Sequence, residues 1–320
     1  MPSVCRRSDY IDMQASQRAG AQRHSFLIGL ALAGCGSILF SAKAVVAKLT
    51  YQYDVTALTV IGFRMLLSLP FFLAIALWQV RKVRRGELKA LTGRQRLELI
   101  GLGFIGYYLA SLLDFIGLEY ISAGLERLIL FLSPTFVLLF SAVFLKRAIL
   151  PKQWLALALS YLGVSLVFVQ DLSLSGDNVL LGALCVLGSA ISYAAYLIGS
   201  GELLKSIGST RLVAYAMSYS AVYTLLHFFG VFGWQGLIQP SGVYGLSLIH
   251  AVFNTVLPTF MTMWAVERVG APMSAQMGLV GPVSVLFLAN WFLDEPITGM
   301  QLLGTVFVLG GAMVLSRRKT

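Results

Sequence analysis

Charged residues are scarce in this chain of 320 residues, and their scarcity excludes an ordinary soluble domain. Only 12% of the residues are Asp, Glu, Lys or Arg, whereas 58% are hydrophobic. A soluble globular protein carries about 25% charged residues. Stretches of about 20 apolar residues recur along the whole chain, and each is long enough to cross a bilayer as a helix. The composition therefore predicts an all-α polytopic membrane protein.

Cysteine and histidine are also scarce, with three of each in the chain. Cys5 lies in a polar stretch and Cys35 and Cys185 lie in apolar ones, so their spacing suits neither a disulfide framework nor a metal site. The phosphate-binding pattern G-x-x-x-x-G-K-[ST] is absent as well. We therefore expect no metal, no cofactor and no nucleotide-driven chemistry.

Ten apolar stretches predict ten transmembrane helices. A polar tail, residues 1–25, precedes them, and we expect it to be retained and disordered, because the apolar run that follows is too long for a signal-peptide core. The predicted spans are 26–49, 56–78, 98–118, 122–145, 151–170, 179–200, 209–232, 242–266, 270–293 and 298–316.

The distribution of charge predicts the orientation of these spans. The net charge is +10, and with the N-terminus in the cytoplasm 20 of the 24 basic residues fall in cytoplasmic segments. This excess of Lys and Arg follows the positive-inside rule, so we expect both termini in the cytoplasm and no nucleic-acid partner. The opposite loops carry mainly acidic residues, namely Asp54, Asp171, Asp177, Asp294 and Glu295.

An internal repeat divides the chain into two halves, 26–170 and 179–316. When 117–168 is laid over 265–316 without a gap, eleven of the 52 positions are identical. Each half holds five predicted spans, and five is an odd number. The second half therefore enters the membrane from the opposite side, which predicts two inverted five-helix repeats. The reversal explains why Lys146-Arg147 aligns with Asp294-Glu295.

The repeated segments share a spacing of particular residues: Ala123 with Pro134, Ala271 with Pro282, Glu295-Pro296, Gln153 with Gly163, and Gln301 with Gly311. In these residues the chain resembles the EamA-type members of the drug/metabolite transporter superfamily. The resemblance implies a ten-helix secondary carrier in the cell (inner) membrane, often an exporter of metabolites, amino acids or drugs. Lys146-Arg147 departs from the family, which has an acidic residue there.

Lys48, near the end of the first predicted span, is expected to form a structural ion pair or to extend to the outer surface. Five further charged residues inside predicted spans of the first half are candidate site residues. They are Lys43, Arg64, Asp114, Glu126 and Arg127, and a charge at a helix centre costs about 2.5–3.5 kcal/mol on insertion scales. All are expected at similar height, towards the non-cytoplasmic side. They form either structural ion pairs or a site that couples substrate to protons.

Polar and aromatic residues recur at helical spacing in several spans. Such stripes line a cavity or pack against neighbouring helices. We take His250, Asn254 and Gln276 as further candidates for the substrate or ion-coupling site. The candidate cavity aromatics are Tyr107, Tyr193, Tyr196, Tyr215 and Tyr219.

Pro134 and Pro282 occupy equivalent positions in the two halves. Proline removes a helical hydrogen bond, so each is either a static bend or a hinge that alternating access would use.

We expect a secondary active transporter for a small-molecule solute, driven by an ion gradient or by substrate exchange. A channel or lipid flippase of the same architecture is an alternative. A remote one is an intramembrane serine hydrolase with Ser200 as nucleophile and His227 or His250 as base.

Overall fold

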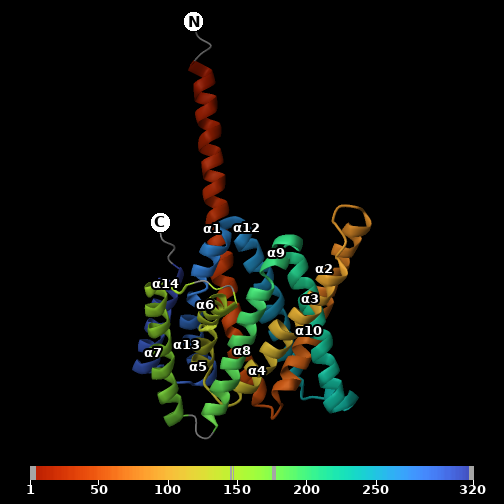
Figure 1. Ribbon diagram of the computed structural model, residues 1–320, viewed down its shortest axis with the longest axis vertical. Coiled ribbons are helices and arrows are strands. Elements are labelled where there is room, and N and C mark those ends of the chain that lie inside the picture. Colours follow the sequence, from red (N-terminus) through yellow and green to blue (C-terminus); the bar gives the residue numbers. More distant parts are fainter. Residues whose placement is uncertain (1–4, 145, 147, 175–177, 317–320) are drawn as a thin grey trace.

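The computed structural model describes residues 5–144, 146, 148–174 and 178–316. Arg147, Asp177 and the basic residues 317–319 of the predicted charge pattern lie outside the described residues. All regular structure in the described ranges is helical. The helix α1 (Cys5–Tyr51) already begins in the polar tail and projects from the bundle (Figure 1). The structure therefore differs from the expected disordered tail; no proline breaks the helix before Tyr51.

The remaining helices follow in short succession. They are α2 (Ala57–Arg84), α3 (Gly93–Gly103), the π-helix η1 (Phe104–Leu109), α4 (Ala110–Leu118), α5 (Ala123–Leu130), α6 (Ser133–Phe144), α7 (Pro151–Leu174), α8 (Val179–Gly199), α9 (Gly201–Ile207), α10 (Ser209–Phe232), the 3-10 helix η2 (Gly233–Leu237), α11 (Ser241–Ala251), the π-helix η3 (Val252–Val256), α12 (Leu257–Met277), α13 (Val280–Leu293) and α14 (Gly299–Ser316).

Eight stretches of the described chain are long and apolar enough to cross a membrane. The apolar helices Val280–Leu293 and Gly299–Val314 are shorter. They fall in the ninth and tenth predicted spans, so length and composition alone give eight spans rather than ten. The ninth is short because its first part is joined to α12, across a kink at Gly270 where φ is 81°.

Both π-helices lie at equivalent places in the two halves. The first begins at Phe104 and the second at Val252, a separation of 148 residues. This is the same offset that aligns the repeated segments of the sequence. π-Helical turns are rare and occur often at functional sites. Their matched positions thus mark a feature common to both halves.

Two smaller details recur at the same offset. Lys146 and Asp294 both have positive φ, 51° and 54°. The side chain of Gln153 accepts from the backbone N–H of Leu150, at 2.7 Å, and that of Gln301 accepts from Thr298, at 3.3 Å. The helices α7 and α14 therefore begin with the same side-chain cap.

The packing of the helices has the same correspondence. The contacts of α1 with α12 and α13 have counterparts in those of α8 with α4 and α6. The helices α7 and α14 lie side by side (Figure 1). Glycines allow their close approach: a Cβ on Gly163 would lie 2.5 Å from the carbonyl oxygen of Gly304, and one on Gly311 would lie 2.7 Å from that of Ala156. Gly311 aligns with Gly163, and Ala156 aligns with Gly304, at the same offset of 148 residues. The two close approaches are therefore equivalent in the two halves.

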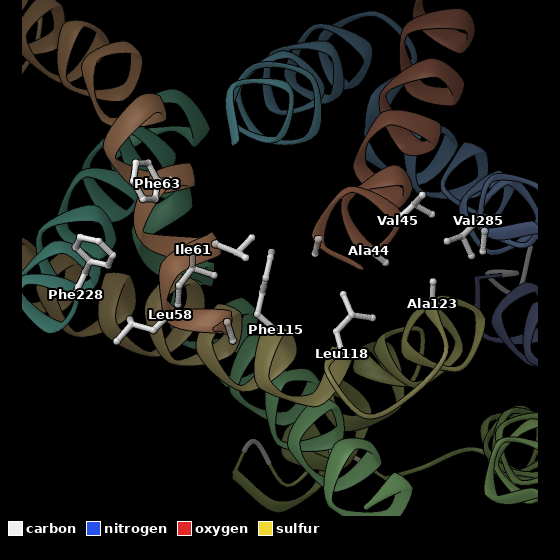
Figure 2. Packing of buried hydrophobic residues seen from close by; sticks show 14 residues of the cluster. Ala44, Val45, Leu58, Ile61, Phe63, Phe115, Leu118, Ala123, Phe228 and Val285 are labelled. Carbon is white, nitrogen blue, oxygen red and sulfur yellow. The ribbon is translucent and has the colours of Figure 1, made fainter. Parts of the chain in front are cut away.

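A hydrophobic cluster at the centre of the bundle fixes the helices that carry the candidate site. Its side chains come from helices of both halves (Figure 2). Burial of a large apolar side chain stabilises the fold by about 1.5–3 kcal/mol. The labelled members are Ala44, Val45, Leu58, Ile61, Phe63, Phe115, Leu118, Ala123, Phe228 and Val285.

Candidate functional site

Three of the predicted intramembrane charges meet beside this cluster. The ammonium of Lys43 on α1 donates a hydrogen bond to Asp114 on α4 and lies 3.1 Å from a carboxylate oxygen of Glu126 on α5. The exposed fractions of Lys43, Asp114 and Glu126 are 5%, 3% and 0%. One buried cation is therefore shared by two buried carboxylates, which compete for it.

Arg64, on α2, lies over the Phe115 ring, which Lys43 also approaches. Its guanidinium donates to the hydroxyl of Ser111 at 2.9 Å, and its central carbon is 4.9 Å from the Phe115 ring centroid. Arginine stacks favourably on an aromatic face. Arg64 is thus held by a hydroxyl and a ring rather than by a carboxylate within 4 Å.

Arg127 follows Glu126 on α5 and lies between two aromatic rings. Its central carbon is 5.5 Å from the Phe40 centroid and 5.4 Å from the Phe131 centroid. Only 7% of the residue is exposed. No carboxylate of the described residues lies within 4 Å of it. A Cβ on Gly281 would lie 2.8 Å from its Nη2, so this glycine leaves room for the guanidinium.

The polar candidates of the second half fall into two groups. His250 is fully buried and stacks on Phe115, with 5.3 Å between ring centroids. Asn254, in η3, donates to the backbone carbonyl of Leu39 on α1 at 2.6 Å. His250 therefore shares the Phe115 ring with Lys43 and Arg64, and Asn254 is bonded to α1 one turn before Lys43. Gln276 is exposed on α12 and lies outside the buried set.

We call Lys43, Arg64, Asp114, Glu126 and Arg127 the central cluster. It holds three basic and two acidic side chains, so its formal charge is +1 when all are ionised. Several of its buried polar atoms have no hydrogen-bond partner among the described residues, namely Arg64 Nε, Asp114 Oδ1, Glu126 Oε2 and Arg127 Nε. Such atoms are expensive unless water or a ligand satisfies them. The cluster can accordingly bind a polar ligand or a proton.

The predicted cavity aromatics also separate into two groups. The hydroxyls of Tyr107 and Tyr196 are 3.2 Å apart, and Tyr193 stacks on Tyr196 with centroids at 5.7 Å. Tyr215 and Tyr219 instead pack against a separate apolar cluster of α3, α9 and α10. The five tyrosines therefore do not form a single lining.

Both predicted hinge prolines follow a break in a helix. The helix α5 ends at Leu130 and α6 begins at Ser133, just before Pro134; α12 ends at Met277 and α13 begins at Val280, just before Pro282. Proline in a first turn interrupts no helical hydrogen bond, because the N–H there has no partner within the helix. A cavity of about 490 Å³ borders Pro134, and its other lining residues are Val137, Leu138, Ser141, Ala148, Leu150, Gln153 and Leu197.

A second group of polar contacts was not predicted as a site. Glu295 accepts from the backbone N–H of Ala123 at 3.1 Å and lies 3.3 Å from the ammonium of Lys48. Asp171 accepts from the N–H and hydroxyl of Ser122, at 2.8 and 3.0 Å. We call these residues the α5 latch, since they hold the first turn of α5. The sequence places Glu295 and Asp171 in predicted loops. The signal for these contacts was Ser122, because serine is a preferred residue at the N-cap of a helix.

The residues of the remote hydrolase hypothesis have other partners. The hydroxyl of Ser200 donates to the carbonyl of Leu197 at 3.2 Å. The Nδ1 of His227 is 2.9 Å from the hydroxyl of Tyr108, and His250 is stacked on Phe115. No nucleophile–base pair results, so this geometry gives the hydrolase hypothesis no support.

Comparison with known proteins places the chain among transporters. The model of the EamA-like transporter family matches residues 27–169 and 180–317. The uncharacterized transporter YcbK of Bacillus subtilis is 30% identical over 293 residues, which cover 86% of this chain and 89% of that protein. A probable amino-acid metabolite efflux pump of Escherichia coli is 28% identical over 210 residues, 60% of this chain and 67% of that protein.

A solved crystal structure is similar in fold. It aligns with a TM-score of 0.57 at 16% identity and covers 91% of this chain and 96% of that chain. At this identity the likeness concerns the fold alone. The two family matches together span nearly all of the described helical bundle. The chain belongs to the EamA-like transporter family and is a multi-pass membrane protein.

Proposed function

We propose that this protein is a secondary active transporter that works by alternating access and exports a small metabolite or amino acid. Ten membrane crossings form two inverted repeats in the cell (inner) membrane, with both termini in the cytoplasm. The paired π-helices, paired caps and reciprocal packing support the repeats, as do the two matches of one family model.

The observation that carries the proposed mechanism is the sharing of Lys43 between Asp114 and Glu126. Lys43 neutralises one carboxylate at close range, so the second depends on a proton or on the more distant Arg64 and Arg127. The two carboxylates are therefore the proposed proton carriers. Their burial requires that a conformational change expose them before protons exchange with water.

The helix breaks before Pro134 and Pro282 are the proposed moving parts. Discontinuous helices at the midplane are typical of transporters built from inverted repeats. Each break divides a span into two short helices that can tilt independently. The cavity of about 490 Å³ beside Pro134 leaves space next to the first of these breaks.

The direction and substrate class rest on the relatives. The Escherichia coli relative is named as a probable amino-acid metabolite efflux pump. We propose the same direction and substrate class for the present chain. Assays with free amino acids and small organic acids test this proposal.

The experiment is a proton-flux assay in proteoliposomes that contain a fluorescent pH indicator. Amino acids and small organic acids are added outside, and the internal pH is followed. We expect at least one solute to change the internal pH through the wild type, with the change lost in Glu126→Gln or Asp114→Asn. Ser160→Cys, a buried change at the α7–α14 interface, is the control and should retain the flux.

Two outcomes would contradict the proposal. Full proton flux in both carboxylate variants would remove the assigned coupling residues. Ion currents that continue without any added solute, or scrambling of labelled lipids, would instead favour a channel or a flippase.

A further inference from the structure

We propose that Arg127 forms a carboxylate-binding subsite, so that the transported solute carries a carboxylate group. This inference deepens the proposed transport function, and the statement that the bound solute is transported rests on that function. The binding of a carboxylate at Arg127 is a separate claim that can be tested without transport.

The argument begins with the partners of the three basic residues. Lys43 is paired with both carboxylates of the central cluster. Arg64 donates to Ser111 and stacks on Phe115. Only Arg127 has neither a carboxylate within 4 Å nor a hydroxyl that accepts from it among the contacts of the described residues. Lys43 and the two carboxylates together carry −1, and Arg64 and Arg127 each add +1, so the cluster as a whole has room for one further negative charge. Arg127 is the arginine of the two that no hydroxyl accepts from, and it is therefore the better candidate for binding that charge.

The surroundings of Arg127 form a built site rather than an exposed patch. Phe40 and Phe131 lie against the guanidinium, and the missing side chain at Gly281 is what lets Nη2 approach α13, since a Cβ there would lie 2.8 Å from it. The hydroxyls of Ser37 and Ser41 lie beside the same glycine and donate to the backbone carbonyls of Gly278 and Ser37, at 3.0 and 2.7 Å. Both hydroxyl donors are thus in use, and the Nε of Arg127 is the donor left for a ligand among these groups.

The chemistry of the Arg127 guanidinium favours a carboxylate as its ligand. A planar guanidinium matches a carboxylate with two parallel hydrogen bonds. The Nε of Arg127 is buried and has no partner among the described residues, so a ligand that accepts from it removes a desolvation penalty. One carboxylate also cancels the single excess charge, whereas a phosphate dianion would reverse it.

The subsite lies next to the proposed proton carriers. Arg127 follows Glu126 directly in α5, and the ammonium of Lys43 lies 5.7 Å from the same Phe40 ring that flanks Arg127. A carboxylate at Arg127 and a proton at Glu126 would therefore alter each other's binding. Such proximity gives a physical route by which solute and proton movement are coupled.

The test uses the purified full-length chain and matched pairs of ligands. Each amino acid and each small aliphatic acid is compared with its own amide, which has nearly the same shape but no negative charge. Thermal-shift measurements find the ligands and calorimetry gives their affinities. We expect binding by carboxylates and a loss of about 10- to 100-fold for the corresponding amides.

The matched variants are Arg127→Gln and Arg211→Gln. Arg211 is equally buried, at 6%, but its guanidinium donates to the backbone carbonyl of Lys89 outside the central cluster. We expect Arg127→Gln to weaken carboxylate binding by about 10- to 100-fold and Arg211→Gln to leave it unchanged. If Arg127→Gln does not fold, Gly281→Ala replaces it, because the added Cβ displaces the guanidinium.

Equal binding of acids and amides by the wild type would overturn the inference. So would a panel in which no carboxylate binds, or undiminished carboxylate binding in a folded Arg127 or Gly281 variant. Carboxylate binding without solute-induced proton flux would leave the subsite standing and contradict the proton-coupled transport. Proton flux with a solute that lacks a carboxylate would leave the proton-coupled transport standing and contradict the inference that the transported solute carries a carboxylate.

Discussion

At the scale of single residues, Lys43 is the group on which the buried charges depend. It is the cation within 4 Å of both Asp114 and Glu126. Its removal would leave two carboxylates buried without a nearby counter-ion at these distances. A broken buried ion pair is strongly destabilising for this reason, whereas removal of all charged partners is often nearly neutral.

We predict that Lys43→Met destabilises the protein by about 3–5 kcal/mol. Lys48→Met is the matched control on the same helix: its ion pair with Glu295 is partly exposed, so a loss below about 1 kcal/mol is expected. Combining Lys43→Met with Asp114→Asn and Glu126→Gln should restore much of the stability. Thermal unfolding in detergent measures all three, and equal effects of the two lysine variants would contradict the account.

Glu119 gives a smaller, pH-dependent effect outside the membrane-spanning stretches. Its carboxylate accepts from the backbone N–H of Ala57 at 2.6 Å, but desolvation raises its pKa despite this hydrogen bond. A raised pKa means that the folded state holds the proton more tightly than the unfolded state. Ionisation of Glu119 therefore lowers stability as the pH rises through the folded pKa.

We predict that Glu119→Gln slightly stabilises the protein at pH 7, by less than about 1 kcal/mol. The amide oxygen still accepts from Ala57 but carries no charge. Below about pH 4 the carboxyl of the wild type is protonated in both states and the advantage disappears. Unfolding temperatures at the two pH values check this, and an advantage that grows on acidification would refute it.

At the scale of elements, the glycines between α7 and α14 control how closely the two halves approach. A Cβ at Gly304 would lie 2.6 Å from the carbonyl oxygen of Gly163 and 2.5 Å from a methyl carbon of Val167. The backbone there cannot give way as a flexible side chain would. This packing joins α7 to α14, the last helix of each half.

We predict that Gly304→Val separates α7 from α14 and destabilises the protein by about 1–3 kcal/mol. Gly310→Val, on the same helix, is the control, because a Cβ there would meet no atom within 4 Å. Detergent stability and the yield of monodisperse protein distinguish the two. Equal behaviour would mean that the two helices do not pack as described.

The sequence predicts some elements well for identifiable physical reasons. Long apolar runs specify where helices lie, and charges such as Glu126 are conspicuous because they are rare inside apolar spans. Helical spacing gives a face but not the neighbour that the face meets. It therefore grouped Tyr215 with Tyr196, whereas the structure packs Tyr215 against a separate apolar cluster.

Other features had no usable sequence signal. The π-helices leave no composition signature in Phe104–Leu109 or Val252–Val256. The prolines at 134 and 282 indicated interrupted spans, but the break itself precedes each of them, since a proline is accommodated in the first turn of the following helix. The α5 latch depends on tertiary contacts between both halves, which spacing along the chain does not reveal.

At the scale of the whole molecule, the α5 latch and the central cluster share two helices, α1 and α5. Glu295, which comes after α13, holds the first turn of α5, and α5 also carries Glu126 and Arg127. A movement of α5 relative to α13 must therefore change both sets of contacts. This linkage is the element that the proposed alternating access would use.

The central claim is that the central cluster is exposed to each side of the membrane in turn. Ser41 tests it most directly, because it is 1% exposed and borders the space next to Arg127. The measurement uses Ser41→Cys in a chain without other cysteines, reconstituted in one orientation. An impermeant maleimide is applied from one side or the other, with Ser160→Cys at the α7–α14 interface as the control.

We predict labelling of Ser41→Cys from both sides, slowed by a bound substrate, and no labelling of Ser160→Cys from either. Labelling of Ser41→Cys from one side only, or from neither, in the presence and absence of an ion gradient would contradict alternating access through this site.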